Sequence, residues 1–274
     1  MSVDVLIPAH AELGEGPRWD AVAGCLLWVD VKRGELHVWD GEEDHLEVVG
    51  APVSAVAPTD DGDVLLAFGD RLALLSGETL ATVPHGAELR LNDGACDADG
   101  RFWVGSMRFD ETKGEDAALY RFDGTLERVL DGVSLSNGIG WSPDGSQMYY
   151  IDTLTRNVDV FDYDGDVANR RALARIEREA GFPDGLAVDD EGGVWVALWG
   201  GSALRRYAPD GSLDRVLELP ALNVTACCFG GDAMFITTAA PDGRVFAADV
   251  GVTGPPAQPF RRTAPSDAEP TSAR

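Results

Sequence analysis

A turn built around glycine recurs six times along the chain, and each copy leads into a short apolar stretch. Five copies carry an Asp-Gly or Gly-Gly pair, while the first, WDAVAG, is looser. The turn glycines, which lie 38 to 47 residues apart, are Gly24, Gly62, Gly100, Gly145, Gly192 and Gly231. A repeat of this length is typical of the blades of a β-propeller.

The stretch after each turn is rich in β-branched and aromatic residues, so it is predicted to be a strand. The six strands expected on this basis cover residues 25–30, 63–68, 101–106, 147–152, 193–198 and 233–238. A second strand with its own turn usually follows, as in residues 118–130 and 203–219, which indicates an antiparallel meander. We therefore predict an all-β chain folded as a six-bladed β-propeller, because closing the ring hides the edges of the sheets.

The two ends of the chain carry no copy of the repeat. Residues 3–8, VDVLIP, have no preceding turn, and we expect them to complete the last blade and so join the two ends of the propeller. The propeller is expected to span residues 1–253. The tail over residues 254–274 is rich in Pro, Ala and Ser and is predicted to be partly disordered, above all past Arg262. Residues 169–180 fit either a helix or a strand.

The chain is strongly acidic, since 22 basic against 47 acidic residues give a net charge of −25. Such a field repels nucleic acid and anionic membrane surfaces, so neither is an expected partner, whereas it attracts cations. No stretch approaches the roughly 18 apolar residues of a membrane helix, and the N-terminus lacks the pattern of a signal peptide. The four cysteines form no CxxC pair, as is typical of a reducing compartment. We expect a cytoplasmic protein, either a monomer or a weak homo-oligomer.

Counting eight residues back from each turn gives an equivalent position in every repeat, with Ala23 replacing the glycine in the looser first copy. The residues at that position are Glu15, Ser54, Asn92, Asn137, Asp184 and Asn223. If the repeats are blades, this position points towards the central axis in each of them. Five of the six side chains are able to coordinate a hard cation or to hydrogen-bond a polyol, and the sixth is serine.

Three members of this ring share a further feature. Glu15, Asn137 and Asp184 are each followed by glycine, which would let the backbone crowd the axis. Two carboxylates and one amide oxygen suit Ca²⁺, Mg²⁺ or Mn²⁺. Three protein ligands would leave positions open for water and substrate, as in a catalytic ion site. The alternative is that these residues belong to surface turns and hydrogen-bond the backbone there.

Arg90 and Asn92 add a second polar pair. They are two residues apart in a predicted strand and therefore lie on the same face, from which both could point into the tunnel. Together they would clamp sugar hydroxyls or a carboxylate, although Arg90 could instead pair with Asp93. The sequence lacks the motifs of other chemistries: its four histidines have no metal-binding spacing, and it contains neither a GxSxG elbow nor a phosphate-binding glycine loop.

Four motifs of the chain resemble those of the senescence-marker-protein/gluconolactonase family, the regucalcin-like lactonases, and occur in the family's order. They are LGEGPRWD (13–20), RLNDGACDADGRFWVGSM (90–107), SNGIGWSPDGSQMYYIDT (136–153) and GFPDGLAVDDEGGVWVALWGG (181–201). The resemblance implies a six-bladed propeller with one divalent ion in a central metal-binding tunnel. The ion would be Ca, Zn, Mn, Mg or Fe, and its ligands would be Glu15, Asn137 and Asp184.

The resemblance also implies roles in substrate binding. Arg90 and Asn92 match positions that contact substrate in the family, and Asp184 would serve as the catalytic acid/base as well as a metal ligand. A further substrate-binding acid follows the family's GxM motif. Both Asp110 and Glu111 stand at suitable positions in this chain, so two assignments stay open.

The reaction best known in the family is the hydrolysis of aldonolactones to aldonic acids. The chemistry of the residues agrees with it, because a cation would polarise the lactone carbonyl for attack by water while Asp184 moves the proton. We therefore predict a metal-dependent hydrolase of carboxylic esters that acts on a small-molecule sugar lactone in carbohydrate metabolism. The alternatives are a hydrolase of another ester or lactone at the same ion site and a non-enzymatic metal-binding propeller.

Overall fold

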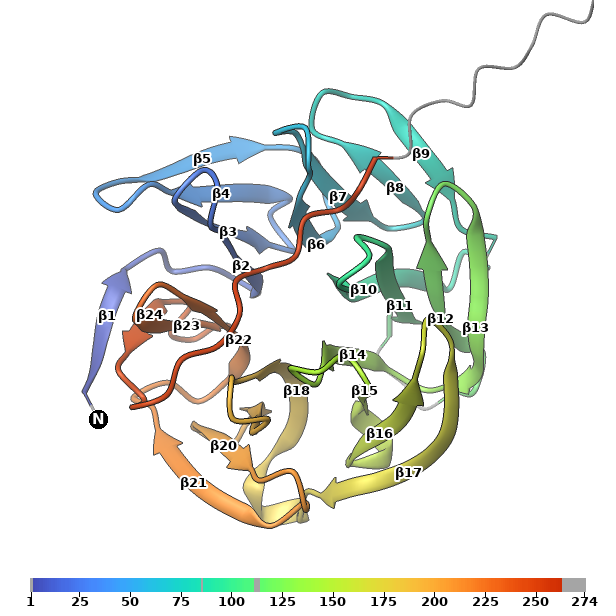
Figure 1. The fold of residues 1–274 in the computed structure, drawn as a ribbon. Coiled ribbons are helices and arrows are strands. Elements are labelled where there is room, and N and C mark those ends of the chain that lie inside the picture. The colour runs from blue at the N-terminus through green and yellow to red at the C-terminus, as the bar shows by residue number, and fades with distance from the viewer. Residues whose placement is uncertain (1, 85, 111–113, 263–274) are drawn as a thin grey trace, which may run out of the picture.

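The computed structural model describes residues 2–84, 86–110 and 114–262 of the chain. Within them the chain forms six four-stranded antiparallel sheets, arranged as blades around a common axis (Figure 1). The six-bladed β-propeller predicted from the glycine repeat is therefore confirmed. The helices in this part of the chain are two three-residue 3-10 turns, η1 (Thr153–Thr155) and η2 (Arg178–Ala180), and neither is long enough to cross a membrane.

The first three blades follow one another along the chain, and each is a meander of four consecutive strands. Blade 1 contains β2 (Gly14–Asp20), β3 (Cys25–Asp30), β4 (Glu35–Trp39) and β5 (Asp44–Val48). Blade 2 contains β6 (Val53–Pro58), β7 (Val64–Phe68), β8 (Arg71–Leu74) and β9 (Thr79–Thr82). Blade 3 contains β10 (Leu89–Cys96), β11 (Phe102–Arg108), β12 (Ala117–Phe122) and β13 (Leu126–Val133).

Blades 4 and 5 repeat this order, and blade 6 departs from it only in its outermost strand. Blade 4 contains β14 (Ser136–Trp141), β15 (Gln147–Asp152), β16 (Asn157–Tyr163) and β17 (Val167–Arg175). Blade 5 contains β18 (Phe182–Val188), β19 (Val194–Trp199), β20 (Ala203–Tyr207) and β21 (Leu213–Glu218). Blade 6 contains β22 (Val224–Gly230), β23 (Ala233–Thr238), β24 (Val245–Ala248) and, from the other end of the chain, β1 (Val3–Ile7).

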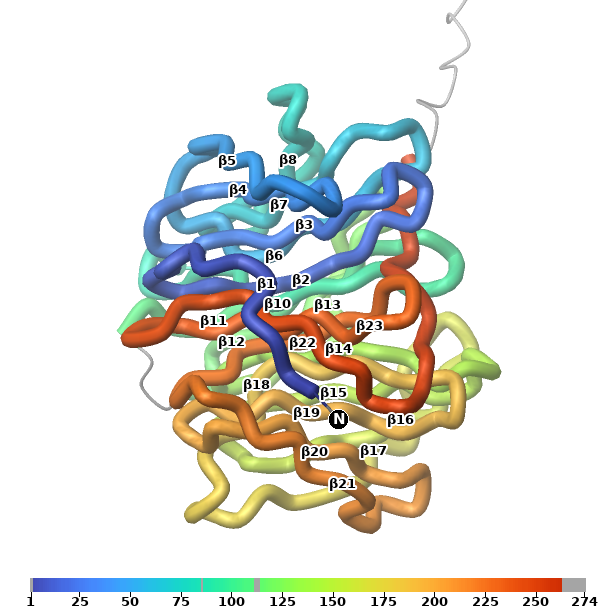
Figure 2. Tube along the Cα trace, turned by 90° about the vertical axis from the view of Figure 1, so that its left-hand side faces the viewer, coloured from blue at the N-terminus to red at the C-terminus, as the bar shows by residue number. Residues whose placement is uncertain are grey.

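The first strand of the chain thus closes the ring, as predicted for residues 3–8. Strand β1 runs antiparallel to β24, with Val3 opposite Ala248 and Ile7 opposite Val245. Figure 2 shows this N-terminal strand, in dark blue, beside the red C-terminal strands. Because the last blade contains strands from both ends of the chain, backbone hydrogen bonds between β1 and β24 hold the segment that leads into blade 1 against the end of the propeller.

Apolar packing between neighbouring blades holds the ring together. The second strand of each blade is buried on both faces because another blade covers each side; all six residues of β3 and five of the six residues of β23 are buried, for example. Six buried apolar clusters result, one between each pair of neighbouring blades. Full burial of one large aliphatic side chain stabilises a fold by about 1.5–3 kcal/mol, so these clusters are the main source of cohesion.

The first strand of every blade lines the axis, and neighbouring first strands contact one another all the way round. Each of these six inner strands contains a register shift of the kind that a β-bulge produces. The residues left out of the regular pairing are 16–17, 54, 92–93, 137–138, 184–185 and 225. A bulge takes a side chain out of the normal alternation, so it is able to point a residue towards the axis.

Two segments whose sequence is not typical of a strand also pack against the propeller. Residues 169–180, which fitted a helix or a strand, form the end of the outer strand β17 followed by η2. Thr253 to Arg262, which we call the C-terminal strap, run over one end of the propeller as an extended segment (Figure 1, red). Phe260 of the strap is 3% exposed and stacks on Phe122 of blade 3. The remainder of the predicted tail lies outside the described residues.

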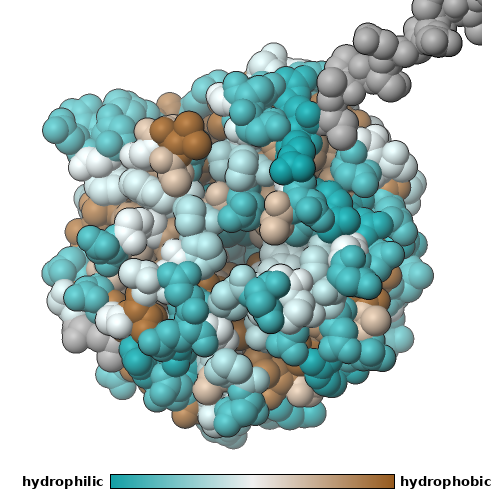
Figure 3. Space-filling model, viewed as in Figure 1, coloured by the Kyte–Doolittle hydropathy of each residue, from teal (hydrophilic) through white to brown (hydrophobic). Residues whose placement is uncertain are grey.

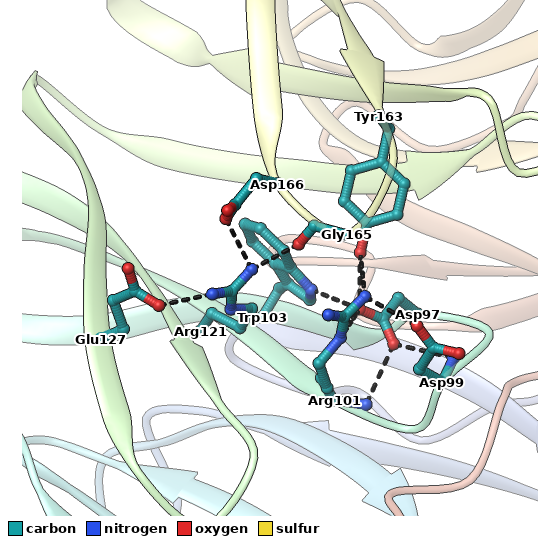
Figure 4. Close-up of polar contacts among 9 residues, drawn as sticks. All are labelled: Asp97, Asp99, Arg101, Trp103, Arg121, Glu127, Tyr163, Gly165 and Asp166. Carbon is teal, nitrogen blue, oxygen red and sulfur yellow. Dashed lines mark hydrogen bonds and ion pairs between the residues drawn. The ribbon is translucent and has the colours of Figure 1, made fainter.

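A buried carboxylate fastens blade 3 to blade 4 (Figure 4). Oδ2 of Asp97 accepts hydrogen bonds from Trp103 Nε1 (2.9 Å), Arg101 Nε (2.8 Å) and the hydroxyl of Tyr163 in blade 4 (2.7 Å). Burial and the hydrogen bond to Asp97 raise the pKa of the Tyr163 hydroxyl, which therefore stays protonated and donates. Arg121 crosses the same interface to the carboxylate of Asp166 at 2.8 Å.

We predict that Asp97→Asn destabilises the protein by about 3 kcal/mol, because the half-buried guanidinium of Arg101 would lose its buried anionic partner and keep only the exposed Asp99. Asp99→Asn is the matched control: Asp99 also pairs with Arg101, but its side chain is 71% exposed against 1% for Asp97. A surface pair of this kind is worth less than about 1 kcal/mol. Urea denaturation of both variants checks the prediction, and equal losses of stability would contradict it.

Candidate functional site

Five of the polar residues singled out from the sequence line one cavity of about 340 Å³ on the axis of the propeller. They are Glu15, Arg90, Asn92, Asn137 and Asp184. They come from four different inner strands, β2, β10, β14 and β18. The fold therefore brings together residues that are up to 169 positions apart in the sequence, between Glu15 and Asp184.

The bulges of the inner strands explain why these side chains reach the axis. Asn92, Asn137 and Asp184 are each the first residue of a bulge, where the strand departs from its regular pairing. Glu15 directly precedes the bulge of β2, in which Gly16 has a φ of +56°. A left-handed backbone at this point favours glycine over any residue with a Cβ atom.

Two glycines let the inner strands approach closely beside the site. A Cβ atom on Gly138 would lie 2.8 Å from the backbone nitrogen of Leu186 in the next blade. A Cβ atom on Gly185 would lie 2.5 Å from Cβ of Ala226. The expected role of these glycines, to let the backbone crowd the axis after Asn137 and Asp184, is thus confirmed.

The hydrogen bonds of Asn137 fix which end of its amide faces the other donors. Thr153 Oγ1 donates to the carbonyl oxygen of Pro183 at 2.8 Å and therefore accepts from Asn137 Nδ2 at 2.9 Å. The amide oxygen of Asn137 then points the other way and accepts a hydrogen bond from Asn92 Nδ2 at 3.1 Å. An amide oxygen oriented in this way has a second lone pair free for a ligand.

Arg90 and Asn92 are held against each other. Nη1 of Arg90 donates to Asn92 Oδ1 at 2.7 Å and to the carbonyl oxygen of Leu91 at 3.0 Å. Asn92 Nδ2 also donates to the carbonyl oxygen of Ser136 at 2.8 Å. Arg90 is 8% exposed, so its guanidinium forms part of the cavity wall rather than a mobile surface group.

The pKa of the Glu15 carboxyl is strongly perturbed. Its pKa is raised to about 8, mainly because removal from water disfavours the anion and secondly because of the nearby charge of Asp93; the hydrogen bond from the Gly16 N–H and the charges of Arg90 and Arg18 act in the opposite direction. Burial also raises the pKa of Asp93, which pairs with Arg18 at 3.2 Å rather than with Arg90. A carboxyl with so high a pKa is poorly solvated as an anion, and a bound cation would relieve this.

The donor set of the cavity fits a hard divalent cation. Two carboxylates and one oriented amide oxygen are the ligand types that Ca²⁺, Mg²⁺ and Mn²⁺ prefer. Among the described residues, no three His, Cys, Asp or Glu side chains gather closely enough to hold a metal without help from other ligands. A metal at this site would therefore depend on Asn137, besides Glu15 and Asp184.

Other residues suggested by the sequence lie apart from the cavity. Asp110 follows β11, its side chain is 55% exposed, and it pairs with Arg108 at 3.2 Å; Glu111 lies outside the described residues. Ser54 occupies the bulge of β6 but donates to the carbonyl oxygen of Ala67. Asn223 precedes β22 and hydrogen-bonds Ala240, so its predicted place in the ring is wrong.

The error at Asn223 has a geometric cause. In blade 6 the bulge residue is Thr225, only six positions before the turn glycine Gly231 instead of eight. The hairpin that follows β22 is shorter, since Gly230 pairs directly with Ala233 across a two-residue loop, whereas Trp141 pairs with Met148 in blade 4. Counting back from the turn therefore overshoots the bulge in this blade.

Several residues of the cavity escaped the sequence analysis. Thr153 orients Asn137, and its only signal was its place at the end of the motif over residues 136–153. Lys32, one of the two lysines of the chain, lines the cavity as well. Phe182 and Trp199 supply an aromatic part of the wall, next to the polar donors. No periodicity marks these four positions, because they come from different places in the repeat.

Comparison with known proteins gives consistent matches. The model of the SMP-30/Gluconolactonase/LRE-like region matches residues 13–240. A regucalcin of Danio rerio is 36% identical over 256 residues, covering 87% of each chain. YvrE of Bacillus subtilis (strain 168), whose name assigns it provisionally as a sugar lactone lactonase, is 36% identical over 247 residues, covering 84% of each chain. The structure of the calcium-binding protein regucalcin of Agrobacterium tumefaciens is similar with a TM-score of 0.88, at 26% identity and with 95% and 98% of the two chains covered.

We predict that Gly185→Ala destabilises the protein by about 1–3 kcal/mol, because the added methyl group would force β18 away from β22. Gly69→Ala is the control, since a Cβ atom there would lie 3.7 Å from Pro52, an ordinary van der Waals distance. The control should change stability by less than about 0.5 kcal/mol. Urea denaturation measures both changes, and a Gly185→Ala protein as stable as the control would refute the tight packing of the two strands.

Proposed function

The chain belongs to the SMP-30/gluconolactonase/LRE-like family, and on this premise we propose that it hydrolyses a sugar lactone to the corresponding aldonic acid in the 340 Å³ cavity. The observation that carries the proposal is the convergence of Glu15, Arg90, Asn92, Asn137 and Asp184 on that one cavity. A pure scaffold gains nothing from burying carboxylates on its axis, where each of them costs free energy of desolvation.

One divalent cation would be held by Glu15, Asn137 and Asp184. Thr153 would act behind these ligands as a positioning residue, because it fixes the direction of the Asn137 amide. When bound, the cation supplies electrophilic polarisation of the lactone carbonyl and makes nearby water more acidic. The ion would be Ca, Zn, Mn, Mg or Fe, and restoring activity with each of them in turn identifies it.

Asp184 would carry the proton through the reaction. It accepts a proton from the water whose oxygen adds to the carbonyl carbon, and returns a proton to the ring oxygen as the bond between carbon and ring oxygen breaks. The product is the open-chain hydroxy acid. Asp184 is 6% exposed, so its carboxylate would face the bound substrate and have little contact with bulk water.

The other residues of the wall would select and orient the sugar. Arg90 and Asn92 present a fixed, mutually hydrogen-bonded pair to the hydroxyl groups or to the developing negative charge on the carbonyl oxygen. Phe182 and Trp199 would cover the less polar face of the ring. The further substrate-binding acid after the GxM motif stays a proposal for Asp110 or Glu111.

The proposed function predicts that activity depends on the metal. Protein stripped with EDTA should lose the hydrolysis of aldonolactones, and one or more of Ca²⁺, Mn²⁺, Mg²⁺, Zn²⁺ and Fe²⁺ should restore it. Acid release in weak buffer, measured over a panel of five- and six-membered aldonolactones, identifies both the ion and the sugar. Metal binding without turnover of any lactone would instead favour another ester as the substrate, or a binding role.

In the restored enzyme, Asp184→Ala should lower kcat/KM by at least about a hundred-fold, because it removes both the proton carrier and a ligand. Asp123→Ala is the control, since Asp123 is an exposed turn residue outside the cavity. Circular dichroism and thermal melting would verify that both variants are folded. An active Asp184→Ala protein would rule out the mechanism proposed here.

We also predict that Thr153→Val weakens metal affinity by about ten-fold or more, because Asn137 loses the partner that orients its amide. Thr155→Val is the matched control: its hydroxyl donates to the carbonyl oxygen of Asp152, away from the cavity. Titration calorimetry of the stripped variants with Mn²⁺ measures the two affinities. Equal affinities for both variants would remove Thr153 from the site.

A further inference from the structure

Lys32 lines the candidate site but has no part in the proposed hydrolysis. We propose that Lys32 binds an acidic group of the substrate, so that the preferred substrate is a sugar lactone with a carboxylate or phosphate group at the end away from the ring carbonyl. The proposal rests on the proposed function, because it names the class of lactone that the same cavity accepts. Lys32 would then determine specificity, while the residues on the inner strands carry out the reaction.

A short turn after β3 holds Lys32 at the cavity. Glu15 pairs with Val29 of β3, and Lys32 stands two residues beyond the end of that strand at Asp30. The carboxylate of Asp30, which is 0% exposed, accepts hydrogen bonds from the backbone N–H groups of Lys32 (3.3 Å) and Glu12 (2.8 Å). The backbone of the turn is therefore fixed, and the long side chain of Lys32 starts from a defined point beyond Glu15.

Lys32 lacks a carboxylate partner among the described residues. Its neighbour in the turn, Arg33, pairs with Asp30 at 3.6 Å, whereas the exposed Lys32 forms no ion pair within this part of the chain. The chain carries a net charge of −25, and hydrophilic residues predominate on the face of the molecule that Figure 3 shows. In a protein with so many carboxylates, an ammonium group that none of them neutralises is available to an anion that enters the cavity.

The charges of the cavity also favour an anion once a cation is bound. Among the described residues that line it, two are acidic, Glu15 and Asp184, and two are basic, Lys32 and Arg90. Their charges cancel when both carboxyls are ionised, so a divalent cation would leave an excess of positive charge. A neutral lactone does not compensate this excess, whereas a lactone with an acidic group does. The acidic exterior repels an anion, and the cavity is the place where this repulsion is locally reversed.

The two basic residues differ in how firmly they are held. Arg90 is 8% exposed and donates to Asn92 at 2.7 Å, so it is fixed in the wall beside the proposed metal ligands. Lys32 lies on an exposed turn, and a lysine acts as a flexible point charge that suits either a carboxylate or a phosphate. The cavity of about 340 Å³ is within the range of sites for small organic molecules.

Matched lactones test the proposal. The five-membered lactones of D-gluconic and D-glucaric acids, closed on the same carbonyl carbon, differ only in that a carboxylate replaces the terminal hydroxymethyl group. The six-membered lactone of D-gluconic acid and its terminal phosphate ester form a second pair, and the pair with the larger preference identifies the acidic group. We expect the metal-restored protein to hydrolyse the acidic member of one pair with a kcat/KM about ten-fold higher, mainly through a lower KM.

Lys32→Met should abolish this ratio between acidic and neutral lactone, and Lys32→Arg should retain most of it, because the charge is kept. Arg33→Gln is the matched control, since it removes one positive charge from the same turn but outside the cavity, and it should leave the ratio unchanged. Equal ratios in Lys32→Met and Arg33→Gln would overturn the proposal, because the effect would then come from the overall charge of the protein.

Binding is measured separately from turnover, by titration calorimetry of the protein loaded with Mn²⁺. D-Glucarate, which has two carboxylates, should bind about ten-fold more tightly than D-gluconate, which has one, and Lys32→Met should remove the difference. Equal binding of the two acids overturns the proposal. Turnover of neutral lactones without a preference for an acidic one also overturns it but leaves the proposed function intact. Tighter binding of D-glucarate without turnover of any lactone would support the role of Lys32 and contradict the proposed function instead.

Discussion

The register shift in each inner strand is the constraint on which the rest of the structure depends. In a regular strand, side chains alternate between the two faces of the sheet, and in a propeller blade both faces are packed against neighbouring blades. A regular inner strand would therefore point its side chains into the apolar clusters and not towards the axis. The bulges at Asn92, Asn137 and Asp184 break this alternation and present polar groups to the centre of a molecule whose cohesion is apolar.

The polar centre and the apolar clusters are compatible because they occupy different parts of the blades. The clusters lie between the faces of neighbouring sheets, whereas the candidate ligands lie at the inner edges. Gly138 and Gly185 make this division possible, since they bring neighbouring inner strands together without inserting a side chain. The cost of the arrangement is the half-buried carboxyl of Glu15, whose raised pKa indicates that the site solvates an anion poorly without a cation. Perturbed groups of this kind are common at functional sites.

Two cavities with no lining residue in common lie against the inner strands, and their walls differ in character. Glu15, Arg90 and the other polar donors line one of them; mostly apolar side chains line the other, together with residues 255–258 of the C-terminal strap. The pair formed by Arg18 and Asp93 lies at the inner strands as well. A buried ion pair contributes little net stability, because desolvation offsets its attraction. Its effect here is geometric, since it joins the inner strand β2 of blade 1 to the inner strand β10 of blade 3.

The sequence by itself determined the blade number, the closing strand over residues 3–8 and most of the candidate site. It did so because the turn glycine and the bulge are separated by a constant number of residues wherever the hairpin has the same length. Asn92, Asn137 and Asp184 therefore occupy equivalent positions in their blades. The count failed at Asn223, where the hairpin is shorter. Only the tertiary structure decided that Arg18 reaches Gly94 across the axis and that Thr153 orients Asn137. Such contacts join different blades or different positions of the repeat, and a periodic pattern carries no information about them.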